Sequence, residues 1–145
     1  MPAKAVVTHL ISKRIAVADL TAAAVTQSFN FGDTIPINAM VTGAWFDLVA
    51  LFAGGGASSA VVDIGDGTDD DGYVDNEDVF TGADTGQRST PTTPPALLDE
   101  NGLDVANAAK VPTLEITSDV NVSALTTGSI IGYIRYDVIP GSSIA

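Results

Sequence analysis

The sequence contains no cysteine, one histidine, and only six lysines and arginines in 145 residues. Without cysteine there can be no disulfide, no thiolate zinc site and no cysteine nucleophile. The six cations stand against 18 aspartates and glutamates, which gives a formal net charge of −12 at pH 7. A body this negative repels phosphate backbones and anionic lipid headgroups, so we expect neither nucleic acid nor a membrane as a partner.

Long hydrophobic runs are also missing. The most apolar stretch, Val41–Ala53, has 13 residues and contains Asp47, whereas a membrane-spanning helix needs roughly 20. The first 18 residues interrupt their apolar side chains with three cations and the histidine: Lys4, Lys13, Arg14 and His9. That pattern lacks the continuous apolar core of a signal peptide, so we expect synthesis and folding in a cytoplasm.

What the sequence does have is alternation with a period of two, which predicts strands. The alternating segments are Ile11–Val17, Ala24–Phe31, Ala60–Ile64, Leu114–Val122 and Ile130–Val138. Turn residues separate them, and no long amphipathic helix is visible. With 46% hydrophobic and 17% charged residues, the chain predicts a single all-β domain over residues 1–145. We expect an antiparallel β-sandwich or a Greek-key or jelly-roll-like barrel.

One predicted strand, Met40–Phe52, is apolar on both faces. Strict alternation places Met40, Phe46, Leu48 and Phe52 on one face and Val41, Trp45, Val49 and Leu51 on the other. A strand of this kind is buried on both sides, so it is either central or covered by a neighbouring subunit. The candidate interface residues from this reasoning are Trp45, Phe46, Leu51 and, from the last strand, Tyr133.

The middle of the chain has a different character. Asp63–Asp84 contains nine acidic residues and no basic one, and Arg88–Pro95 is rich in proline. We therefore predict a long loop region over residues 66–110, with one helical turn near Asp75–Asp78. An extended N-terminal arm is expected over residues 1–10.

The acidic loop is the strongest candidate for a metal site. Calcium takes six to eight oxygen ligands, and Asp66, Asp69 and Asp71 offer closely spaced carboxylates among glycines. The spacing departs from an EF-hand, because aligning on Gly72 places Gly67 where the first acidic ligand belongs. The alternative is a tight turn in which each aspartate accepts hydrogen bonds from its own backbone. No cofactor other than calcium is expected.

The sequence contains few candidate catalytic residues. Two aspartates in a pocket are a conceivable hydrolase pair, but eighteen acids produce many pairs by chance. His9 has no neighbouring nucleophile and no metal-ligand spacing, so we expect it at the surface or in an interface. We expect no enzymatic activity.

Two segments carry a family resemblance. Residues 35–42 read Ile-Pro-Ile-Asn-Ala-Met-Val-Thr, and after the two-sided strand and Gly54-Gly55-Gly56 comes Val62-Asp-Ile-Gly-Asp-Gly-Thr-Asp-Asp-Asp-Gly-Tyr-Val74. Residues 125–136 then read Leu-Thr-Thr-Gly-Ser-Ile-Ile-Gly-Tyr-Ile-Arg-Tyr. This arrangement resembles small virion structural proteins of tailed bacteriophages over Asn30–Val74 and Leu125–Val138, about 40% of the chain.

The resemblance implies a head decoration, or cement, protein on the capsid surface of a virion, made in the host cytoplasm. Such proteins are commonly homotrimers whose partner is the major capsid protein. The basic N-terminal segment, with Lys4, Lys13 and Arg14, is then expected to dock on an acidic patch of the capsid. The alternative is a receptor- or glycan-binding module of a phage fibre or tail that depends on calcium.

Overall fold

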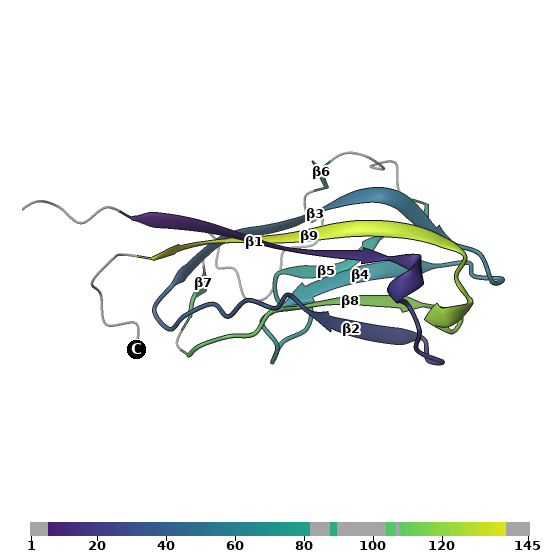
Figure 1. The fold of residues 1–145 in the computed structure, drawn as a ribbon, viewed down its shortest axis with the longest axis horizontal. Helices are drawn as coiled ribbons and strands as arrows, with labels where there is room; N and C mark the ends of the chain where they lie inside the picture. Colours follow the sequence, from purple (N-terminus) through teal and green to yellow (C-terminus); the bar gives the residue numbers. More distant parts are fainter. Residues whose placement is uncertain (1–5, 82–87, 90–103, 107, 139–145) are drawn as a thin grey trace, which may run out of the picture.

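The computed structural model describes residues 6–81, 88–89, 104–106 and 108–138, which form two antiparallel sheets packed face to face (Figure 1). Sheet A has the order β1 (Val7–Ala16), β9 (Thr127–Val138), β3 (Met40–Ala53) and β6 (Arg88–Ser89), and β7 (Asp104–Val105) also pairs with β3. Sheet B has the order β2 (Thr26–Asn30), β8 (Thr113–Ser118), β4 (Ala60–Gly65) and β5 (Val74–Asp78). Two 3-10 turns lie at Val17–Asp19 and Val122–Ala124. The predicted all-β sandwich is confirmed.

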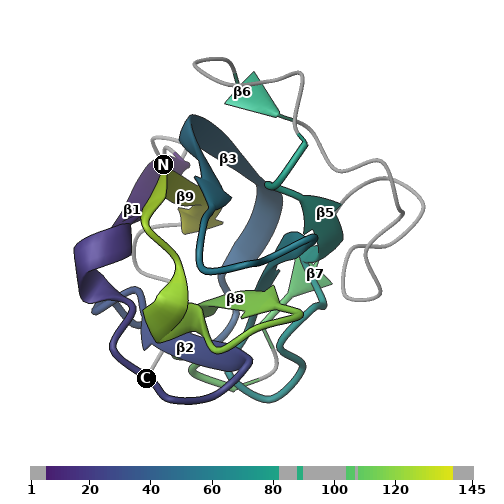
Figure 2. The same cartoon turned by 90° about the vertical axis from the view of Figure 1, so that its right-hand side faces the viewer.

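The pairing follows one long rolled hairpin. β1 pairs with β9, β2 with β8, β3 with β6 and β4 with β5, all antiparallel. The tip of this hairpin is the turn between β4 and β5, and its open end is the β1–β9 ladder. Rolling the hairpin divides the pairs alternately between two sheets, which is the strand order of a jelly roll. Seen along the strands, β1 and β2 lie on one side of the sandwich and β5 and β6 on the other (Figure 2).

The core lies between the sheets. Sheet A contributes Ile11, Ile15, Phe46, Leu48, Ile130 and Ile134, and sheet B contributes Val62, Ile64, Leu114 and Ile116. Gly132 sits among them on the inner face of β9, because a Cβ there would lie 2.6 Å from Leu114 Cδ1. The side chains of Leu114, Ile64 and Phe31 pack directly against this glycine, so a larger residue would require them to move.

The two-sided strand differs from its prediction. The β3–β9 register shifts between Val41 and Gly43, so one extra residue moves Val41 to the core side and Met40 to the outer side. Phe46 was predicted at an interface, and this is wrong: it is 1% exposed and packs between the sheets. The outer face of β3 is only partly covered, with Val49 43% exposed.

Two further boundaries differ. Val7–Leu10, predicted as part of an arm, belong to β1 and pair with Arg135–Val138 of the last strand. In the predicted loop region, the helical turn near Asp75–Asp78 is wrong, since these residues extend as β5 alongside β4. A bulge with Asn76 at φ 50° bends the strand there. Residues 1–5, 82–87 and 90–103 lie outside the described part of the chain.

Candidate functional site

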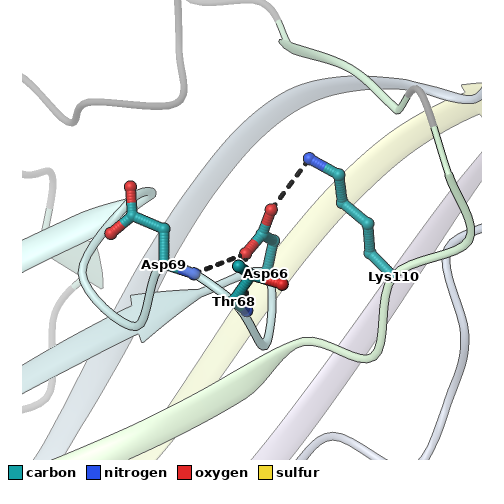
Figure 3. Close-up of polar contacts among 4 residues, drawn as sticks. All are labelled: Asp66, Thr68, Asp69 and Lys110. Carbon is teal, nitrogen blue, oxygen red and sulfur yellow. Dashed lines mark hydrogen bonds and ion pairs between the residues drawn. The ribbon is translucent and has the colours of Figure 1, made fainter.

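The first candidate, the acidic turn between β4 and β5, separates its three predicted ligands. Asp66 is buried and forms an ion pair with Lys110, with Nζ to Oδ2 at 2.9 Å, while its Oδ1 accepts hydrogen bonds from the backbone N–H groups of Thr68 and Asp69 (Figure 3). Burial tends to raise the pKa of Asp66, but these N–H groups and the Lys110 ammonium together lower it. Both carboxylate oxygens of Asp66 therefore stabilise the turn, as in the tight-turn alternative to a metal site.

The neighbouring carboxylates gather without Asp66. Ligand oxygens of Asp69, Asp70 and Asp71 lie within 4.8 Å of one another, and the Asp69 side chain points away from Lys110 (Figure 3). The close Asp69 carboxyl, followed by burial, raises the pKa of Asp71. Three carboxylates at this spacing can hold a hard divalent cation, so the candidate metal site contains Asp70 in place of the predicted Asp66.

Sequence reasoning missed a buried carboxylate on β4. Asp63 is 6% exposed and accepts a hydrogen bond from the bulged Asn76 N–H at 2.6 Å. Burial is the main cause that raises its pKa to about 6; the hydrogen bond lowers it, and the negative charges of Glu115, Asp71 and Asp75 raise it further. The available signal was a single acid inside the apolar run Val61–Ile64.

Asp63 lines neither of two surface hollows at one end of the sandwich. One hollow, of about 620 Å³, contains Asp66 and Lys110; the other, of about 680 Å³, is lined by His9, Thr34, Pro36, Ile37, Ala108, Ala109, Tyr136 and Val138. The hydrolase hypothesis needs a carboxylate with a raised pKa in a pocket. Asp66, the carboxylate that does line a hollow, has a lowered pKa.

His9 is exposed, as predicted, and belongs to the apolar hollow. Its ring stacks on Tyr136 with centroids 5.0 Å apart and an angle of 13° between the ring planes. The pair comes from directly opposed positions on β1 and β9. Tyr136 is buried, and burial raises the pKa of its hydroxyl.

The outer side of sheet A carries an aromatic and basic surface. Trp45 and Tyr133 are cross-strand partners with stacked rings, 5.7 Å between centroids, and the Arg135 guanidinium lies 5.7 Å from the Trp45 centroid. Arg135 Nε also donates a hydrogen bond to Thr42 Oγ1 at 2.8 Å. We call this surface the aromatic–basic face and define it by Leu10, Trp45, Val49, Tyr133 and Arg135.

The outer side of sheet B has the opposite character. It carries Asp63, Asp75, Asp78 and Glu115 with hydroxyl side chains between them, and we call it the acidic face. Ser28 Oγ donates to Glu115 Oε2 at 2.6 Å, and Thr26 and Thr117 pair across the strands. The sandwich therefore presents an aromatic–basic side and an acidic side, although Asp47 and Asp137 also lie on the outer side of sheet A.

The other predicted interface residues are dispersed. Lys13 and Arg14 lie at the C-terminal end of β1, half-buried and exposed respectively, and Leu51 is half-buried on β3. Lys4 lies outside the described residues.

No family model, no curated protein and no solved structure matches this chain. Within the described residues, no helix is long and apolar enough to cross a membrane.

Proposed function

We propose that this chain is a non-enzymatic structural protein of a bacteriophage virion that binds the outside of the capsid and stabilises it. Its partner is the major capsid protein, and the working assembly is a homotrimer on the capsid surface. The phage assignment is supported by the sequence resemblance over residues 30–74 and 125–138. The jelly-roll order is compatible with it, because capsid proteins and lectins both use this fold.

The aromatic–basic face is the observation that carries the proposal. Tryptophan, tyrosine and arginine are the residues most enriched in the energetically dominant centres of protein interfaces. Here they are held on paired strands of a packed sheet, so little side-chain entropy is lost when a partner covers them. Leu10, at 56% exposed, extends the apolar area to the edge strand. The acidic face then points away from the capsid and keeps the particle soluble.

The direct test mixes the purified chain with undecorated capsids assembled from the major capsid protein of the same phage. We expect binding at micromolar concentration and a higher temperature of capsid disruption. Trp45→Ala and Arg135→Ala should each weaken binding by about tenfold or more, as expected for interface centres. The matched control is Ser28→Ala on the acidic face, which should bind like the wild type. Failure of the wild type to bind, or equal binding by Trp45→Ala, would contradict the proposal.

A second candidate is a calcium-dependent receptor- or glycan-binding module. The gathering of Asp69, Asp70 and Asp71 favours it, together with the stacked Trp45–Tyr133 pair, since aromatic rings are the side chains on which sugar rings stack. It predicts that millimolar calcium raises the melting temperature and that EDTA abolishes glycan binding. Asp69→Asn with Asp71→Asn should remove the calcium response, whereas Asp33→Asn, an exposed carboxylate elsewhere, should keep it.

A further inference from the structure

The outer edge of β1 is the longest of several sheet edges that lack a neighbouring strand among the described residues. All ten residues of β1 pair with β9 in one uninterrupted register, and nothing described here pairs with the other side of the strand. The strand has no proline, glycine or bulge, and Val7 and Leu10 are 41% and 56% exposed. Long, regular edges of this kind pair readily with other chains, so natural proteins cover or interrupt them.

Another such edge is that of β5, on the opposite side of the sandwich from β1 (Figure 2). It borders sheet B and pairs only with β4 among the described strands. On this strand Asp75 is half-buried, Asp78 is exposed and Glu77 is buried. Over its five residues β5 carries three acids and no cation.

The charges of the two edges are opposite. β1 carries His9, Lys13 and Arg14 and no carboxylate, in a chain whose acids outnumber its cations by 18 to 6. The edges lie on opposite sides of one rigid sandwich, so they cannot meet within a single copy. They can meet between two copies.

We propose that copies of this chain associate head to tail, with the basic β1 edge of one copy beside the acidic β5 edge of the next. Complementary charge identifies the occupant of each edge as a second copy, because β1 against β1 or β5 against β5 brings like charges together. An interface between two different surfaces of the same chain closes into a ring when the rotation between copies divides a full turn, and it continues as a filament when it does not. We propose the closed form because the assembly proposed above is a homotrimer. Lys13 and Arg14 then contact the neighbouring copy. The inference rests on the homotrimer of the proposed function, to which it assigns the contacting edges, but it does not depend on capsid binding.

The test measures the mass of the purified full-length chain by light scattering or sedimentation, without capsid. In low salt we expect a closed ring of at least three copies, and in about 0.5 M NaCl we expect dissociation because such salt screens the edge charges. Arg14→Glu and Asp75→Arg should each weaken association about tenfold or more. The double variant Arg14→Glu/Asp75→Arg again has opposite edges and should recover the ring.

Controls separate this inference from capsid binding. Glu115→Gln removes a charge on β8, which has a paired strand on either side, and should leave the ring intact. Arg135→Ala should weaken capsid binding while the ring persists, so capsid binding and ring formation can fail independently. Circular dichroism and melting curves establish that each variant is folded. A monomer at all concentrations in low salt would overturn the inference. A dimer whose association is unaffected by Asp75→Arg would also overturn the inference, and so would a double variant that stays dissociated.

Discussion

Replacing Asp63 with asparagine should make the protein more stable at neutral and alkaline pH. In the folded chain this carboxyl is 6% exposed and its pKa is raised to about 6 from 3.8, chiefly by burial. The folded state therefore holds the proton more tightly than the unfolded state. Stability from this group is fully present below pH 3.8 and is lost as the pH rises through 6. The difference of about 2.2 pKa units corresponds to about 3 kcal/mol.

The asparagine side chain would carry no charge at any of these pH values, and its amide oxygen can still accept the Asn76 N–H bond that the Asp63 carboxylate accepts at 2.6 Å. At pH 8 we expect Asp63→Asn to raise the free energy of unfolding by up to about 3 kcal/mol, or the melting temperature by roughly 6–12 °C for a domain of this size. At pH 4 the variant and the wild type should differ little.

Urea denaturation from pH 4 to pH 8 measures this difference directly, with the slope of each transition checked for unchanged surface exposure. Asp33→Asn makes the same chemical change at an exposed position and serves as the control. The reasoning is refuted if Asp63→Asn is no more stable than the wild type at pH 8. It is also refuted if the difference between the two proteins does not grow as the pH rises from 4 to 8.

Three further changes test the packing and the turns. Gly132→Ala should lower the free energy of unfolding by about 1–3 kcal/mol in urea, because its Cβ would meet Leu114 at 2.6 Å, while Gly43→Ala, with its nearest neighbour at 3.6 Å, should change it little. Asp66→Ala should destabilise by about 1–3 kcal/mol in the same assay, since it leaves two backbone N–H groups and the Lys110 ammonium without their partner; Asp70→Ala, at an exposed carboxylate, is the control. Asp119→Ala should lower the melting temperature at pH 7, because Asp119 accepts hydrogen bonds from Ser58 and Ser59 that lower its pKa to about 2, and this loss should fade as the pH falls from 4 towards 2.

The strands were predictable where the pleat is regular. Alternation along Ile11–Ile15 and Ile130–Val138 correctly separated inner from outer side chains, because a regular ladder keeps its period of two. Val17, predicted on the same face as Ile11 and Ile15, lies beyond the strand in a 3-10 turn. Along β3 the same reasoning placed Val41 on the wrong face, since one bulged residue reverses all assignments beyond it. Gly43 stands at that bulge and was the available signal, since a glycine inside a strand pattern often marks one. Phe46 was misplaced at an interface because both faces of the strand were interpreted as shared surface.

The candidate site was predictable only in its composition. The density of aspartates after β4 located the acidic turn, but the residue that neutralises Asp66 is Lys110, 44 positions further along the chain. No local pattern joins those two positions. Asp63 was missed for a related reason, because its burial depends on the β5 bulge that presents the Asn76 N–H to it. The Trp45–Tyr133 stack likewise depends on the pairing register of β3 and β9, which no local pattern in the sequence reveals.

The rolled hairpin also sets the order in which the protein can fold. Its β4–β5 tip joins residues close together in the chain, whereas the β1–β9 ladder joins Val7 to Val138. During synthesis β1 therefore leaves the ribosome long before its only described partner. Closing so long a loop is slow, and folding dominated by distant pairings proceeds on the millisecond-to-second scale. Until β9 arrives, both edges of β1 are open, so the nascent chain is most prone to mispairing through the same strand whose outer edge we assign to a neighbouring copy.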